Sequence, residues 1–166
     1  HGTFYLYFQN KRDAFSQVMT DICQRMYEEA ELSWDGDPSE AVVGGVRSFF
    51  QVFAEHRGLW RALVEGALQD PVIEATWVDL RRPFVDRLER LLEHLVAAGS
   101  IPPLDTVVAA PALGSMVEWF AFTHFVLGQP PESEVGIDRA ARGVAEVWMR
   151  SVFASDQAST TITSSN

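Results

Sequence analysis

The feature that most constrains this chain is the spacing of its apolar residues, which return every three or four positions over most of its length. A spacing near 3.6 places side chains on one face of an α-helix, whereas a half-buried strand alternates at every second position. No strand pattern competes with the helical one. The sequence therefore predicts an all-α protein of about six helices. The clearest stripe consists of Trp77, Leu80, Phe84, Leu88, Leu91 and Leu95.

Helix start signals divide the chain into segments. Asp37-Pro38 and Asp70-Pro71 each combine a capping residue with a proline that suits the first helical position. Asp105 is a further candidate cap. The expected helices cover about 14–34, 38–55, 71–98, 105–127 and 135–154, with a short apolar segment at 59–68. The first of them is expected to bury Phe15, Val18, Ile22 and Met26.

Length and composition limit the class of protein. A chain of 166 residues that is 47% hydrophobic and 22% charged has enough residues for one domain with a buried core. A single cysteine, Cys23, excludes a disulfide framework and a cysteine-based zinc site. No secretory signal is visible, and residues 155–166 form a polar tail. The net charge of −10 by itself argues against a large nucleic-acid-binding surface.

The segment from Val107 to Gly128 is apolar on all sides, with Glu118 and His124 as its only titratable residues. Such a helix lies in a membrane or is buried on more than one side. Its polar residues and the soluble character of the other segments disfavour a membrane span. We therefore expect this helix to lie between its own core and a partner subunit.

Catalytic and phosphate-binding motifs are absent from the sequence. It contains no HExxH, GxSxG, P-loop or GxGxxG pattern, and its four histidines lack metal-ligand spacing. We expect no enzyme activity, no metal and no cofactor. Cys23 is expected to be a packing residue and His124 a hydrogen-bonded interior or interface residue. The alternatives that stay open are a helical enzyme or lipid carrier, with Glu118 and His124 as its polar groups, and a helical interaction module with a filled core.

Aromatic residues are numerous for a helical chain of this size: eleven Phe, five Trp and three Tyr. Large rings that surround an apolar hole make a small-molecule pocket. Gly44-Gly45, inside an expected helix, would leave room for a ligand beside Phe49. The residues expected around an apolar ligand are Phe49, Phe53, Trp60, Trp77, Phe84, Trp119, Phe122 and Trp148.

The first fifteen residues carry the most specific motif, made of Thr3, Tyr5, Tyr7, Phe8, Lys11 and Phe15. This pattern resembles the end of the helix-turn-helix of TetR-family transcriptional repressors. The order of the expected helices downstream is similar to that family as well. The chain resembles most closely the subgroup that contains the repressor of ethionamide activation, through Phe49-Phe50 with Phe53, Trp77, Gln129-Pro130 and Val147-Trp148.

The resemblance implies a TetR-like helical fold in three parts. Residues 1–12 would be the end of a truncated DNA-binding helix-turn-helix domain, 13–154 a ligand-binding and dimerisation domain, and 155–166 the polar tail. A recognition helix places its early residues in the major groove of DNA. The missing part of that domain would supply most of the basic surface, which weakens the objection from net charge. The implied operator-binding residues are His1, Gly2, Thr3, Tyr5, Tyr7 and Lys11.

The resemblance also implies the partners. They are operator DNA, a second subunit bound through the last two helices (about 105–127 and 135–154), and a hydrophobic small-molecule effector. The function implied is that of a cytoplasmic, ligand-responsive repressor whose operator binding is released by the effector. The sequence does not identify the effector or the operator, and it leaves open whether the effector acts as inducer or corepressor.

Overall fold

The computed structural model describes residues 2–29 and 38–153, with the backbone alone at 2–10, 29 and 38. All regular elements in these ranges are helical, which confirms the all-α prediction. They are α1 (Gly2–Glu29), α2 (Pro38–Glu55), α3 (Arg57–Ala67), α4 (Pro71–Ala97), α5 (Thr106–Ala121), the π-helical turn η1 (Phe122–Val126) and α6 (Ile137–Val152).

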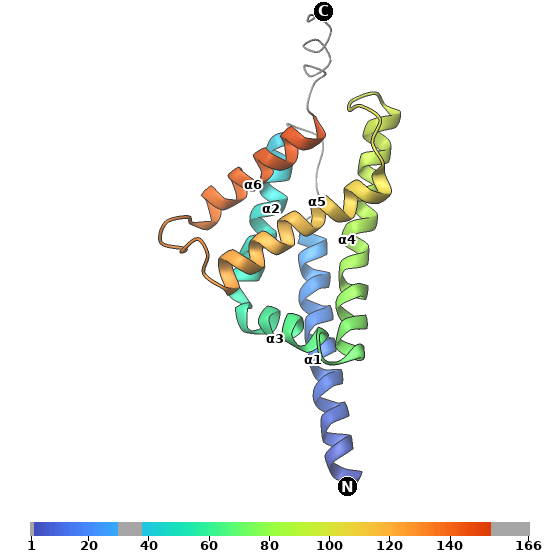
Figure 1. Cartoon of the computed structure of the whole chain (residues 1–166), viewed down its shortest axis with the longest axis vertical. Helices are drawn as coiled ribbons and strands as arrows, with labels where there is room; N and C mark the ends of the chain where they lie inside the picture. The colour runs from blue at the N-terminus through green and yellow to red at the C-terminus, as the bar shows by residue number, and fades with distance from the viewer. Residues whose placement is uncertain (1, 30–37, 154–166) are drawn as a thin grey trace, which may run out of the picture.

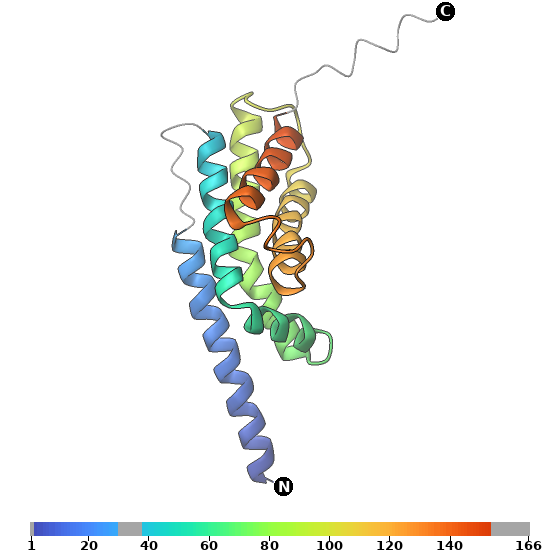
Figure 2. The ribbon, with the colours of Figure 1, turned by 90° about the vertical axis from the view of Figure 1, so that its left-hand side faces the viewer.

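The helices pack in a bundle that α3 closes at one end (Figure 1). α6 packs chiefly on α2, and α5 packs on α4, while α1 contacts both α2 and α4. The beginning of α1 extends past the other helices (Figure 2). One end of α1 is therefore part of the core, and the other end projects from the body of the protein.

Two predicted helix starts are confirmed by capping contacts. The Asp70 carboxylate accepts a hydrogen bond from the Val72 backbone N–H at 2.9 Å, and α4 begins at Pro71. The Asp105 carboxylate accepts one from the Val108 N–H at 3.4 Å. Asp37 and the polar tail lie outside the described residues.

The core is formed by apolar faces of all six helices, including the predicted stripe of α4, whose six residues pack against it. One member of the α1 stripe was predicted wrongly: Val18 is 44% exposed, and Met19 is buried instead. A helical stripe through Phe15, Ile22 and Met26 accommodates either residue, because spacings of three and four both keep to one face. Packing on two helices selects Met19. The buried α1 residues are Met19, Ile22, Cys23 and Met26.

α1 is one uninterrupted helix, although the sequence motif predicted a boundary between two helices near residue 13. No proline lies between Gly2 and Glu29, and no glycine follows Gly2 in that range. Because these two residues are the strongest helix breakers, nothing local stops the helix between them. The motif residues and the buried residues of α1 thus belong to one rigid element.

α5 and η1 together form an apolar segment that is mostly half-buried within the chain. In the described residues, Thr106–Val126 is the one helical stretch long and apolar enough to cross a membrane, judged by length and composition alone. Only 22% of its most apolar window is buried. The sequence predicted that a partner subunit covers this helix. Val107, Val108 and Trp119 are exposed on it and are available for such a contact.

Candidate ligand cavity

A cavity of about 200 Å³ lies inside the bundle and is lined by residues of all six helices. An apolar cavity of about 150 Å³ holds a benzene molecule. This one therefore has room for a single aromatic ring with a short substituent. Its lining residues from α4, the helix that contributes most, are Trp77, Leu80, Arg81, Phe84, Val85, Arg87, Leu88 and Leu91.

Six of the eight predicted ligand-binding residues line this cavity: Phe49, Phe53, Trp60, Trp77, Phe84 and Trp148. Gly45 lines it too, next to Phe49 in space as the sequence suggested. The Phe53 and Trp60 rings stack with their centroids 4.1 Å apart and their planes 3° from parallel. Trp60 Nε1 is buried and has no hydrogen-bond partner in the described part of the chain.

Trp119 and Phe122, which were also expected around a ligand, are not among the lining residues. They stack on each other with ring centroids 5.3 Å apart, and Trp119 is 54% exposed. Each step along an α-helix turns the side chain by about 100°. Because Glu118 lines the cavity, its neighbour Trp119 points elsewhere.

A polar contact between α4 and α5 interrupts the apolar wall. The Glu118 carboxylate lies 2.6 Å from Arg81 Nε and accepts a hydrogen bond from Trp77 Nε1 at 2.9 Å. Arg81 also donates to Ser115 Oγ at 2.9 Å. Glu118 and Arg81 both line the cavity.

Two further lining residues, Arg87 and Cys23, can carry a charge. The Arg87 guanidinium lies 3.4 Å from the centre of the Tyr27 ring and donates to the Tyr27 carbonyl oxygen. Cys23 is 5% exposed. Burial, with a smaller contribution from the charge of Glu118, raises the pKa of Cys23 to about 12. The thiol is therefore protonated at neutral pH and behaves as a small apolar group, as predicted.

Most of the chain matches a known protein family. Residues 42–154, more than half of the chain, match the model of the C-terminal domain of the transcriptional regulator EthR. The chain belongs to the TetR family of transcriptional regulators. Because this family consists of regulators and not of enzymes, the expectation that the chain is not an enzyme is confirmed.

Individual relatives agree with the family assignment. The HTH-type transcriptional regulator EthR of Mycolicibacterium smegmatis (strain ATCC 700084 / mc(2)155) is 23% identical over 158 residues, which are 91% of this chain and 70% of the relative. The fold is similar to that of a protein from Mesorhizobium loti MAFF303099 assigned to the TetR family of transcriptional regulators, with a TM-score of 0.68 and 19% identity. That match covers 92% of this chain and 80% of the other.

The DNA-binding residues implied by the TetR resemblance fall at the projecting end of α1. His1 lies outside the described residues, and so do the side chains of Gly2, Thr3, Tyr5 and Tyr7, whose backbone is helical. The Lys11 side chain is exposed. Operator binding by these residues stays a prediction.

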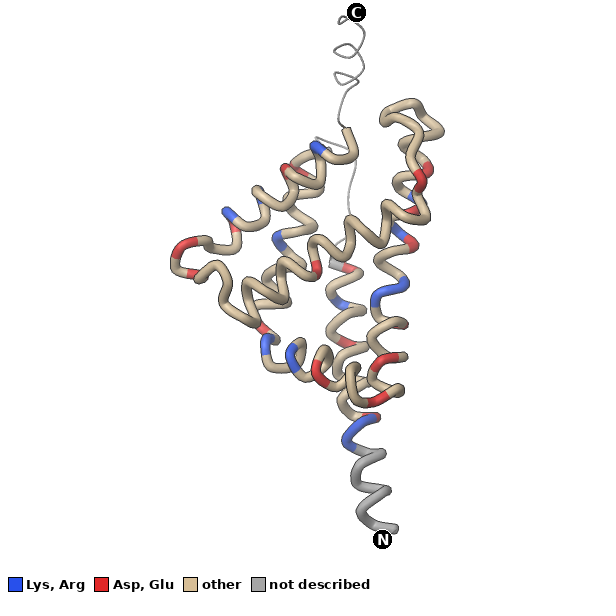
Figure 3. Tube along the Cα trace, viewed as in Figure 1, with Lys and Arg blue, Asp and Glu red and all other residues tan. Residues whose placement is uncertain are grey.

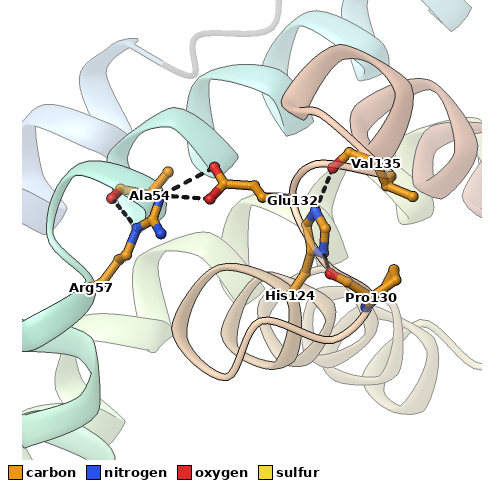
Figure 4. Close-up of polar contacts among 6 residues, drawn as sticks. All are labelled: Ala54, Arg57, His124, Pro130, Glu132 and Val135. Carbon is orange, nitrogen blue, oxygen red and sulfur yellow. Dashed lines mark hydrogen bonds and ion pairs between the residues drawn. The ribbon is translucent and has the colours of Figure 1, made fainter.

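His124 lies apart from the ligand cavity of this TetR-family chain. It is 1% exposed, and both of its ring nitrogens contact backbone carbonyl oxygens (Figure 4). The prediction of a hydrogen-bonded interior histidine is confirmed. Among the described residues, no group of His, Cys, Asp and Glu is arranged to hold a metal ion.

Arg81, its contact with Glu118 and the leucines of α4 were not predicted as lining residues. Arg81 follows Trp77 by four positions and so shares its face of the helix, which is a signal present in the sequence. The predicted ligand-binding residues were all aromatic, so Arg81 was not among them. Its pairing with Glu118, 37 positions away, depends on how α4 and α5 pack, which no local pattern specifies.

Proposed function

We propose that this chain is the ligand-binding and dimerisation part of a DNA-binding repressor whose operator affinity is lowered by a hydrophobic small molecule. The observation that carries the proposal is the apolar cavity lined by residues of all six helices, one of which is α1. The family assignment supplies the class of protein, and the cavity supplies the place for an effector. Such a regulator acts in the cytoplasm, where its operator is.

α1 is the element through which a bound molecule would act on the operator. Cys23 and Met26 of α1 line the cavity, and the same helix continues to Gly2 at its projecting end. A ligand shifts a conformational equilibrium only if it binds one state better than the other. An effector that pushes the buried half of α1 would move its other end, and a coupling of about 1–3 kcal/mol is enough for regulation.

The charge at that end of α1 is compatible with DNA contact. Lys11 and Arg12 stand at the first described side chains of α1, and basic and acidic residues are intermixed over the rest of the body (Figure 3). Arg12 forms an ion pair with Asp70 at 3.1 Å, which fixes α1 to the start of α4. Lys11, with the tyrosine hydroxyls nearby in sequence, would contact phosphates and set the register on DNA.

The proposed dimer forms through α5 and α6. On α5, Val107, Val108 and Trp119 are 69%, 62% and 54% exposed, and on α6 Val147 is 57% exposed. Exposed apolar patches of this kind mark interaction sites. Two copies related by a two-fold axis would bury them in a four-helix bundle, and two operator half-sites would share that axis.

The decisive test is binding of the full-length regulator to the DNA upstream of its own gene. We expect saturable binding in fluorescence anisotropy, with preference over scrambled DNA and weaker binding at higher salt, because phosphate contacts release counterions. A chain that shows no preference on any genomic fragment and that carries lipid after purification would instead be a carrier.

A second test separates the cavity from the DNA contacts. Phe53→Ala and Trp77→Ala enlarge the cavity and change no residue of the projecting end of α1. They should change the concentration of a releasing compound needed to free the operator, with operator affinity itself nearly unchanged. Leu68→Ala, at a residue that is 82% exposed, is the control. Loss of operator affinity in a folded, dimeric Phe53→Ala protein would contradict the assignment.

A further inference from the structure

We propose that the Arg81–Glu118 ion pair sets the specificity of the cavity, and that it selects uncharged aromatic compounds that carry a hydrogen-bond acceptor. The inference rests on the proposed function, because it concerns the effector of the same cavity. It goes further by naming the chemical class of that effector and the two residues that recognise it.

The ion pair is built into the wall and held from both sides. Glu118 receives a contact on each carboxylate oxygen, from Arg81 Nε at 2.6 Å and from Trp77 Nε1 at 2.9 Å. Its side chain is 19% exposed and that of Arg81 is 35% exposed. Each charge is thus neutralised at close range by the other, in surroundings that are otherwise apolar.

A charged ligand would disturb this balance. A carboxylate that reached Arg81 would lie next to the Glu118 carboxylate, and an ammonium group that reached Glu118 would lie next to Arg81. In both cases the ligand brings a like charge close to one member of the pair, and it also loses part of its own hydration. Arg87, the third charged lining residue, is occupied by its contacts with Tyr27. An uncharged ligand leaves the pair intact.

Arg81 retains hydrogen-bond donors that a ligand can use. A guanidinium group carries five N–H bonds and no acceptor. The contacts of Arg81 with Glu118 and Ser115 account for two of them within the described residues. A carbonyl oxygen on the ligand would accept from Arg81, whereas a pure hydrocarbon would cover these donors without replacing their water. The cavity therefore favours a compound with an acceptor over a hydrocarbon of the same shape.

The size of the cavity determines suitable probes. With about 200 Å³ available, a phenyl ring with a three- or four-carbon chain is the appropriate scale. Four compounds of nearly equal size share a phenyl ring and a four-carbon chain, and they differ in the polar group and in its position on the chain. They are butyrophenone (a neutral acceptor), n-butylbenzene (no acceptor), 4-phenylbutanoate (an anion) and 4-phenylbutylamine (a cation).

Isothermal titration calorimetry of the full chain with these probes tests the inference. We expect butyrophenone to bind on the order of tenfold more tightly than n-butylbenzene, and more than tenfold more tightly than either charged compound. Equal affinities for all four would overturn the specificity proposal and leave the cavity as a ligand site. If none of the four bound, the specificity proposal and the proposed ligand response would both be overturned.

Two reciprocal variants test the role of the ion pair itself. Glu118→Gln keeps an acceptor for Trp77 but leaves Arg81 without its counter-charge, so 4-phenylbutanoate should gain on the order of tenfold in affinity while butyrophenone changes little. Arg81→Gln should produce the corresponding gain for 4-phenylbutylamine. The matched control is Glu146→Gln, which removes the carboxylate of an exposed Arg150–Glu146 pair on α6.

Two control measurements show whether a variant has misfolded or has kept its fold and its cavity. Each is checked for a cooperative thermal transition, and butyrophenone binding reports whether its cavity is intact. A folded Glu118→Gln protein that binds butyrophenone but gains nothing for the anion would overturn the role of the ion pair. A gain for the anion in Glu146→Gln as well would show that overall charge, and not the cavity pair, is responsible.

Discussion

His124 holds the loop between the last two helices through Pro130: its Nδ1 lies 2.6 Å from the Pro130 carbonyl oxygen (Figure 4). On the other side of the ring, Nε2 lies 2.7 Å from the Val135 carbonyl oxygen. One buried side chain of η1 thus spans the segment that leads into α6. An ion pair between Arg57 and Glu132 at 2.8 Å ties the same loop to the start of α3.

Replacing His124 should therefore loosen the approach to α6. In His124→Gln the flexible amide carries its donors on a single nitrogen, so it cannot replace both ring nitrogens, and a buried polar group is left incompletely bonded. We expect a loss of about 2 kcal/mol in the free energy of unfolding, measured by urea denaturation. His94→Gln, at an exposed histidine on α4, is the control and should change stability by less than about 0.5 kcal/mol. Equal effects of the two substitutions would contradict a structural role for His124.

The buried thiol of Cys23 predicts how stability depends on pH in the alkaline range. Burial raises the pKa of this thiol from its ordinary value of 9.0 to about 12 in the folded chain. Below pH 9 the thiol is protonated in both states and contributes no pH dependence. Above pH 9 the unfolded chain releases the proton while the folded chain retains it, so the free energy of unfolding falls as the pH rises.

The measurement compares the wild-type chain with Cys23→Ala by urea denaturation at pH 8 and pH 10. The wild type should lose about 1 kcal/mol more than the variant between these two values. Other alkaline groups titrate equally in both proteins, so the difference isolates the thiol. Identical losses would mean that the thiol ionises as easily in the folded chain as in the unfolded one.

Pro83 predicts a stabilising substitution. It is exposed within α4, which continues on both sides of it, and proline offers no backbone N–H to the helix. Pro83→Ala restores that donor and should raise the free energy of unfolding by about 1–3 kcal/mol. Pro71→Ala is the matched control, since Pro71 is at the first position of the same helix, where no N–H is needed. A lower stability of Pro83→Ala would mean that the proline ring makes packing contacts that outweigh the lost hydrogen bond.

The helices and their caps could be predicted because both depend on local sequence. The stripe of α4 and the cap at Asp70 follow from residues within a few positions of each other. The cavity could be predicted only in part, because the rotation of each helix about its own axis decides which of its residues face the cavity. Phe53 and Trp60 were placed correctly, whereas Trp119 was one residue away from the position that faces inward.

Two features of the structure were not predicted, for different reasons. The contact between Arg81 and Glu118 joins α4 to α5, and its existence depends on the packing of helices that are distant in sequence. The continuity of α1 was missed because the apolar stripe predicted a helix that begins at residue 14 and the resemblance placed a domain boundary at residue 13. The residues between Gly2 and Glu29 include no helix breaker, so helix propensity describes this part of the backbone correctly.

The exposed apolar face of α5 and α6 leads to a prediction about assembly. Val147 is 57% exposed on α6 and Val78 is 53% exposed on α4, so the two valines have similar exposure in one chain but lie on different helices. If α6 pairs with a second subunit, Val147→Glu places a charge in that interface, where desolvation is costly, and should raise the dimer dissociation constant at least tenfold. Val78→Glu should leave it unchanged. Sedimentation equilibrium over a range of concentrations measures both, and an effect confined to Val78→Glu would move the interface to α4.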